Sequence, residues 1–248
     1  MWIEPDWPAP AWVRALTTTR AGGVSEGPYR SLNLAGHVGD APAQVAANRA
    51  RLRAAAGLPA EPAWLEQVHG CGVCRLDAES VPGGIGRRAD AAVTAHPDTV
   101  CAVLTADCLP VLLCDAGGSV VAAVHAGWRG LLDGVVEAAA VRMARPPATL
   151  MAWLGPAIGP DAFEVGDEVR EAFCRRIDGA EAVFRPSPAG RWLADLYALA
   201  RLRLAAIGVG RVSGGGLCTL TDAERFFSYR RDGATGRMAT LIWIDSGR

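Results

Sequence analysis

The chain contains no lysine, since all 25 residues counted as Lys or Arg are arginine. This absence excludes a P-loop lysine, a Schiff-base lysine and a Ser-Lys catalytic pair. The chain also lacks any run of about 18 uninterrupted apolar residues, the length that a membrane-spanning helix requires. Its formal net charge is −1, so neither sign of charge is in excess. We therefore expect neither a nucleic acid nor a membrane surface as partner.

Cysteine is too sparse for a disulfide-bonded scaffold. There are seven cysteines in 248 residues, an odd number, whereas small secreted domains have dense, even sets. The first residues, MWIEPDWPAPAWVRA, carry acids and prolines where a signal peptide has a basic start and an apolar core. Reduced thiols and a cytoplasmic location are therefore expected.

Half of the residues are apolar, which is enough to bury the core of one α/β domain spanning residues 1–248. The periodicity predicts helices over 41–57 and 131–143. The apolar segments LPVLLC and SVVAAVH, with a turn at 115–118 between them, predict a hairpin whose strands are covered on both faces. A second hairpin is predicted around residues 231–236. The Gly-rich stretch 81–90 lacks the G-x-G-x-x-G order, which argues against a dinucleotide site.

Three residues of the kind that bind zinc stand at the edges of apolar segments. They are His69 in WLEQVHG, Cys108 in TADC and His125 at the end of SVVAAVH. A catalytic zinc site has three such ligands and one open position, where the pKa of a bound water falls to about 7. No two of these residues have a short diagnostic spacing, so the spacing alone leaves open that the histidines are ordinary core residues.

A possible anion site follows His125 directly. Residues 127–130 read Gly-Trp-Arg-Gly and lead into the predicted helix, and the start of a helix attracts phosphate. Arg129 would add a forked pair of donors, unless it pairs with a structural carboxylate. In the loop 17–40, Arg20 and Asn33 either reach the same pocket or are solvated turn residues.

Several motifs together identify a resemblance. TADCLPVLLCD, AAVHAGWRG, EQVHG, GPAIGPDAFEVG and CTLTDAERFFSYRRDGATGRM resemble the YfiH-like family along nearly the whole chain. Members of that family have been labelled laccase-domain proteins, polyphenol oxidases, peptidoglycan editing factors and multifunctional purine nucleoside enzymes. The resemblance implies a single-domain layered α-β-β-α sandwich with mixed sheets, and a Zn2+ ion held by His69, Cys108 and His125. It also implies phosphorolysis of adenosine, inosine, guanosine and methylthioadenosine, together with adenosine deamination.

These activities need further groups beside a metal. Asp107 and Glu66 are the candidates to move protons, and either is equally suited to orient a histidine. Arg20 and Asn33 are candidates to close over sugar or phosphate. Cys218 and the aromatic residues of RFFSY are candidates to line the base pocket, although an aromatic run on a strand is also typical of a core.

Other functions remain open at this stage. One is hydrolysis of an amide in a peptidoglycan precursor, either by zinc-activated water or by Cys108 with a histidine as its base. Another is a metal-stabilised module that binds a partner. Copper oxidation of phenols is disfavoured, because a multicopper centre needs many imidazoles and this chain has four histidines. Both a monomer and a homodimer are compatible with the sequence.

Overall fold

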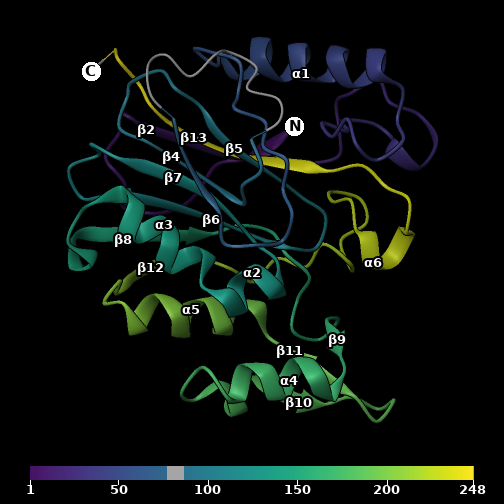
Figure 1. Ribbon diagram of the computed structural model, residues 1–248. Helices are drawn as coiled ribbons and strands as arrows, with labels where there is room; N and C mark the ends of the chain where they lie inside the picture. Colours follow the sequence, from purple (N-terminus) through teal and green to yellow (C-terminus); the bar gives the residue numbers. More distant parts are fainter. Residues whose placement is uncertain (77–86, 248) are drawn as a thin grey trace.

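The computed structural model describes residues 1–76 and 87–247. Two β-sheets pack face to face, and helices cover the outer face of each, as the layers in Figure 1 show. The order of layers is therefore helix, sheet, sheet, helix, which confirms the predicted α-β-β-α sandwich. The Gly-rich stretch predicted as a loop lies mostly within 77–86, outside the described residues.

The first sheet is antiparallel and has four strands. In spatial order they are β1 (Trp2–Ile3), β2 (Val13–Thr18), β13 (Met238–Ile244) and β5 (Cys101–Thr105). Its outer face packs against α1 (Pro42–Ala56). That helix agrees with the prediction: Pro42 opens it, and Gly57 ends it in the left-handed conformation, at φ 59°.

The second sheet has six strands and is mixed. In spatial order they are β12 (Arg211–Gly214), β8 (Leu150–Leu154), β6 (Leu109–Asp115), β7 (Val121–Ala126), β4 (Ala91–Thr94) and β3 (Val73–Leu76). β6 and β7 form the predicted antiparallel hairpin, and every residue of both strands is buried. Their near-continuous apolar sequence follows from this position, because one face meets the other sheet and the opposite face meets the helices.

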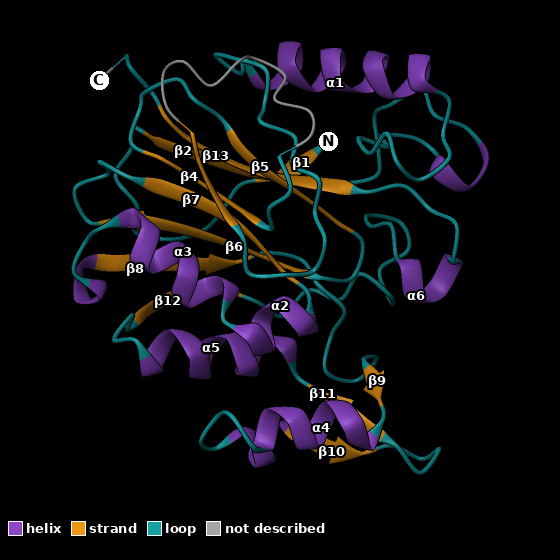
Figure 2. Ribbon diagram, viewed as in Figure 1, coloured by secondary structure: helices purple, strands orange, loops and turns teal. Residues whose placement is uncertain are grey.

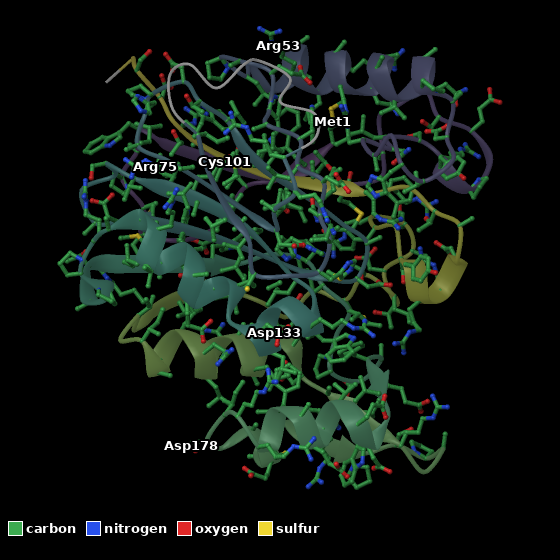
Figure 3. The ribbon with its side chains drawn as sticks, viewed as in Figure 1. Met1, Arg53, Arg75, Cys101, Asp133 and Asp178 are labelled. Carbon is green, nitrogen blue, oxygen red and sulfur yellow. The ribbon has the colours of Figure 1, made fainter. Side chains whose placement is uncertain are left out.

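Side chains fill the space between these layers (Figure 3), where Cys101 on β5 is buried between the two sheets. The outer helices of the six-stranded sheet are α2 (Trp128–Asp133), α3 (Val135–Met143) and α5 (Leu196–Ala206). Beyond α5, Figure 2 shows α4 (Asp167–Cys174) beside a small antiparallel sheet. Its strands are β10 (Phe184–Pro186), β11 (Trp192–Ala194) and β9 (Glu164–Val165).

Two of the predicted elements are wrong in detail. The helix predicted over 131–143 begins earlier, at Trp128, and is broken into α2 and α3 by Gly134, whose φ of 95° interrupts the helix. The hairpin predicted around 231–236 does not form. Instead a short helix, α6 (Tyr229–Asp232), precedes β13, which pairs with β2 and β5 far away in the sequence. Tertiary pairing has overridden the local turn signal there.

The break between α2 and α3 is held by a charged network. Arg203 on α5 donates to the carbonyl oxygens of Leu131 (3.0 Å) and Leu132 (2.7 Å) at the end of α2. Its Nε also lies 2.8 Å from a carboxylate oxygen of Glu137 on α3. Arg203 thus satisfies carbonyl groups that the interruption at Gly134 would otherwise leave without partners.

Among the described residues, no helix is both long and apolar enough to span a membrane. The seven cysteines are all free thiols.

Candidate metal centre

The β6–β7 hairpin brings Cys108 and His125 together. In its register Leu109 faces Ala126 and Pro110 faces His125, so Cys108, one residue before β6, comes opposite Gly127. Hence two residues that are 17 positions apart in sequence meet at one end of the hairpin. Gly127 is required here, because a Cβ at this position would lie 2.9 Å from the His69 ring and 3.1 Å from Cys108 Sγ.

His69 completes the cluster from a loop. The candidate ligand atoms of His69, Cys108 and His125 all lie within 4.8 Å of one another, and Cys108 Sγ is 3.7 Å from His69 Nε2. His69 is exposed, Cys108 is half-buried and His125 is buried. Because the protein covers one side of the cluster and solvent reaches the other, the arrangement leaves room for a further ligand, as an open catalytic site requires.

A buried carboxylate, Asp90, organises the cluster. It stands immediately before β4, opposite His125 in the β4–β7 pairing, and its Oδ1 lies 2.8 Å from His125 Nδ1. The same carboxylate accepts the backbone N–H groups of His69 (2.9 Å) and Gly70 (2.8 Å). With Nδ1–H donated to Asp90, His125 presents Nε2 to a metal, which is the usual role of a carboxylate behind a ligand histidine.

The backbone of His69 has an uncommon conformation. Its φ is 61°, in the left-handed region that a residue with a side chain rarely occupies. The hydrogen bonds from its own N–H and from that of Gly70 to Asp90 hold the loop in this conformation. Such local strain, of the order of 1–3 kcal/mol, persists only where the surroundings determine it, and it is common at functional sites.

The electrostatics favour the ligand form of the cysteine. Burial opposes ionisation of Cys108, but the positive charge of His125 and hydrogen bonds to both histidines outweigh it and lower the pKa of the thiol to about 6. Burial likewise acts against protonation of His125, whereas Cys108 and Asp90 raise its pKa to about 9. A thiolate at neutral pH is the species that binds a metal. The same pair also fits a Cys-His nucleophile.

Among the described residues, Asp90 is the carboxylate that bonds the ring of a ligand histidine, whereas Asp107 and Glu66 have other contacts. Asp107 accepts the Thr219 hydroxyl (2.6 Å) and the backbone N–H of Arg230 (2.6 Å), so it joins the start of β6 to the segment that carries α6. The Glu66 side chain is 60% exposed and lies 3.9 Å from Arg88.

Arg129 lies at the start of α2, two residues after Gly127. Its side chain is exposed, and its guanidinium stacks on the ring of Trp128 at 4.3 Å. No carboxylate among the described residues lies within ion-pair distance of it. Within the described part of the chain, Arg129 therefore has no acidic partner.

The remaining predicted site residues form bonds within the protein. Arg20 donates to the carbonyl oxygens of Arg30 and Ala223 and stacks on Phe227. Asn33 is fully buried, and its amide bonds Ala35, Asp40 and the backbone of Arg237.

Cys218 lies beside Gly159, whose backbone N–H donates to its sulfur at 3.2 Å. Burial acts against ionisation, but hydrogen bonds from Thr221, Gly159 and Leu220 lower the pKa of this thiol. Phe226 and Phe227 are fully buried and belong to the core, whereas Tyr229 is 61% exposed.

The chain is similar to known proteins along nearly its whole length. The model of a family described as multi-copper polyphenol oxidoreductase laccase matches residues 14–245. A purine nucleoside phosphorylase of Pseudomonas aeruginosa is 53% identical over 244 residues, which is 98% of each chain. The purine nucleoside phosphorylase YfiH of Escherichia coli is 55% identical over 242 residues, again 98% of each chain.

The chain belongs to this laccase-like family of YfiH proteins. The resemblance predicted from the motifs is thereby confirmed.

Solved structures of YfiH-type proteins share the fold. A protein of Neisseria meningitidis superposes with a TM-score of 0.93 at 53% identity and covers 99% of both chains. YlmD of Geobacillus stearothermophilus gives a TM-score of 0.91 at 30% identity and covers 99% of this chain and 96% of its own.

The several copper ions that the family's description implies do not fit this member. The chain has four histidines, all within the described residues, and two of them are in the cluster. Of the other two, His37 lies in the loop before α1 and His96 follows β4. One group of two imidazoles and one thiolate cannot supply the ligands of several copper ions.

Proposed function

We propose that this YfiH protein is a zinc-dependent purine nucleoside enzyme of the transferase class, which cleaves nucleosides with phosphate and also deaminates adenosine. The observation that carries the proposal is the cluster of His69, Cys108 and His125, backed by Asp90 and open on one side. The names of relatives more than half identical to this chain support the choice of nucleosides as substrates.

Two imidazoles and one thiolate are a ligand set that suits zinc. When bound, zinc would supply a Lewis acid and a water molecule of lowered pKa. The protein would hold His125 through Asp90 and would fix His69 through the backbone bonds to the same carboxylate. We propose adenosine, inosine, guanosine and methylthioadenosine as the substrates.

The two reactions have different requirements. In phosphorolysis a phosphate oxygen forms a bond to C1′ of the ribose, the C1′–N9 bond breaks, and the purine leaves and takes up a proton. In deamination water adds at C6 of adenosine and ammonia leaves. Only the first reaction needs an anion site, for which we propose Arg129 and the start of α2 beside Gly127. Asp107 or Glu66 would move the protons.

The deciding experiment follows the products of single nucleosides. Inosine with phosphate should give hypoxanthine and ribose 1-phosphate, and adenosine without phosphate should give inosine. Inert nucleosides together with cleavage of a muramyl-peptide precursor would replace the proposal by amide hydrolysis. Inactivity on both substrate classes would favour a partner-binding module.

Changing Arg129 to alanine should separate the two reactions. The loss of a charge-assisted hydrogen bond should cost phosphorolysis about 1.5–3 kcal/mol of transition-state stabilisation, which is about a 10- to 150-fold decrease in kcat/KM for phosphate. Deamination should fall much less, and the metal content should stay unchanged. Arg142→Ala, an exposed change on α3, is the matched control. An equal loss of both reactions in Arg129→Ala would mean that the residue binds the nucleoside.

A further inference from the structure

Arg237 stands beside the metal cluster although 129 positions separate it from Cys108 in the sequence. In the antiparallel pairing of β13 with β5, Met238 faces Thr105. Extending this pairing by one residue therefore places Arg237 opposite Ala106, which lies two residues before Cys108. The backbone register alone brings this arginine to the segment that carries the thiolate ligand.

The guanidinium of Arg237 has donors to spare. One of its nitrogens, Nη1, donates to the carbonyl oxygens of Thr235 (2.9 Å) and Gly236 (3.0 Å). Among the described residues, no hydrogen bond engages Nε or Nη2, and no carboxylate lies within ion-pair distance. The residue is only partly exposed. A partly buried cation without an acidic partner is costly to maintain, which suggests that it has a partner of another kind.

One contact holds the backbone of Arg237, and another lies beside its guanidinium. Its own backbone N–H donates to Asn33 Oδ1 at 3.0 Å, and its Cζ lies 5.7 Å from the centre of the Tyr229 ring. Tyr229 begins α6, and the next residue, Arg230, is tied to Asp107 through its backbone N–H. The arginine and the residue next to Cys108 are thus fixed relative to one another.

Charged groups of both signs surround Arg237. The pKa of His37 is lowered, first by burial and then by the positive charges of Arg237 and Arg49. Burial lowers the pKa of Arg237 as well, and the nearby negative groups that oppose this effect are first Cys108 and then Asp107. Asp107 keeps its negative charge, because its hydrogen-bond donors, the Thr219 hydroxyl and the backbone N–H of Arg230, are neutral. Arg237 therefore lies within electrostatic reach of the segment that carries the thiolate ligand.

We infer that Arg237 is a phosphate-binding residue of this site, positioned by Tyr229, and that it approaches the anion from the β13 side while Arg129 approaches from α2. The inference rests on the proposed function in that phosphate is taken as the co-substrate. A guanidinium with two free nitrogens, Nε and Nη2, matches two oxygens of one phosphate, and this geometry distinguishes arginine from a point charge.

The test compares Arg237→Met and Arg237→Lys with wild type. In Arg237→Met the KM for phosphate should rise at least about tenfold, whereas phosphate-independent deamination of adenosine and the zinc content should change little. The lysine variant, which keeps the charge without the fork, should be intermediate. Arg225→Met is the matched control, because Arg225 is paired with Asp222 outside the cluster. Tyr229→Ala should raise the same KM, and Tyr229→Phe should restore it.

A second readout does not depend on turnover. Inorganic phosphate should raise the thermal midpoint of the wild-type holoenzyme, and this shift should be lost in Arg237→Met but kept in Arg225→Met. A KM for phosphate within twofold of wild type in Arg237→Met, while wild type performs phosphorolysis, would overturn the inference. If wild type performs no phosphorolysis, the proposed function fails, and the thermal shift alone tests the anion site. In that case a phosphate-induced shift that is equal in Arg237→Met and wild type, or absent in both, would overturn the anion site.

Discussion

Cys108→Ala should lose its metal and reduce both phosphorolysis and deamination to background. The substitution removes the one anionic ligand of the cluster, and the two imidazoles that remain are a poor set for zinc. Metal analysis should find about one zinc per wild-type chain and less than roughly a tenth of that in the variant. Because Cys108 is only half-buried at the open side of the cluster, the thermal midpoint of the apoprotein should change little.

Cys71→Ala is the control for this experiment, since Cys71 is an exposed thiol outside the cluster. Full metal occupancy in Cys108→Ala would remove the site that we propose. Demetallation of wild type distinguishes the metal from the Cys-His alternative. If Cys108 were a nucleophile with His125 as its base, activity would survive a chelator and be lost on alkylation.

Asp90→Asn should weaken metal binding about 10- to 100-fold, the range for losing the carboxylate behind a ligand histidine. An amide keeps one acceptor oxygen and turns the other into a donor. That donor would face either the N–H groups of Val68 and Gly70 or the pair formed by His69 N–H and the His125 ring. Leaving these donors unpaired should also cost about 1–3 kcal/mol of unfolding free energy.

Competition with a chelator measures the first effect of Asp90→Asn, and thermal or denaturant unfolding measures the second. Asp115→Asn is a matched control, because Asp115 also accepts backbone N–H groups, those of Ser119 and Val120, but in the turn at the far end of the same hairpin. It should lose stability and keep its zinc affinity. If both variants bound zinc as wild type does, Asp90 would be a purely structural acceptor.

Local periodicity and turn residues were sufficient to predict the first helix and the β6–β7 hairpin, whereas the layered sandwich was predicted from the resemblance of the motifs to a known family. The hairpin also explains why Cys108 and His125 meet. Asp90 was missed because a single aspartate before an apolar strand gives no signal of its own. It acquires its role only when β4 pairs with β7 and sets it opposite His125.

Local sequence patterns also failed to predict the structure near the C-terminal end of the chain. RRDGATG has the composition of a hairpin turn, yet it forms α6 and a loop because β13 has partners elsewhere. The break at Gly134 was also hidden, since glycine is tolerated within a helix and only its φ of 95° reveals the interruption. Asn33 and Arg20 were candidates to close over sugar or phosphate, and their hydrogen bonds to the surrounding loops could not be predicted from the sequence.

The place of β13 between β2 and β5 has a consequence for synthesis of the protein. The hydroxyls of Thr17 and Thr240 meet at 2.7 Å across 223 positions of sequence. While the ribosome is still making the segments before β13, β2 and β5 each have an unpaired edge, which is a hazard for aggregation. The β6–β7 hairpin can pair early, whereas Arg237 reaches Cys108 only when β13 inserts. A nascent chain stalled before residue 238 should therefore need chaperones and should lack the complete anion site.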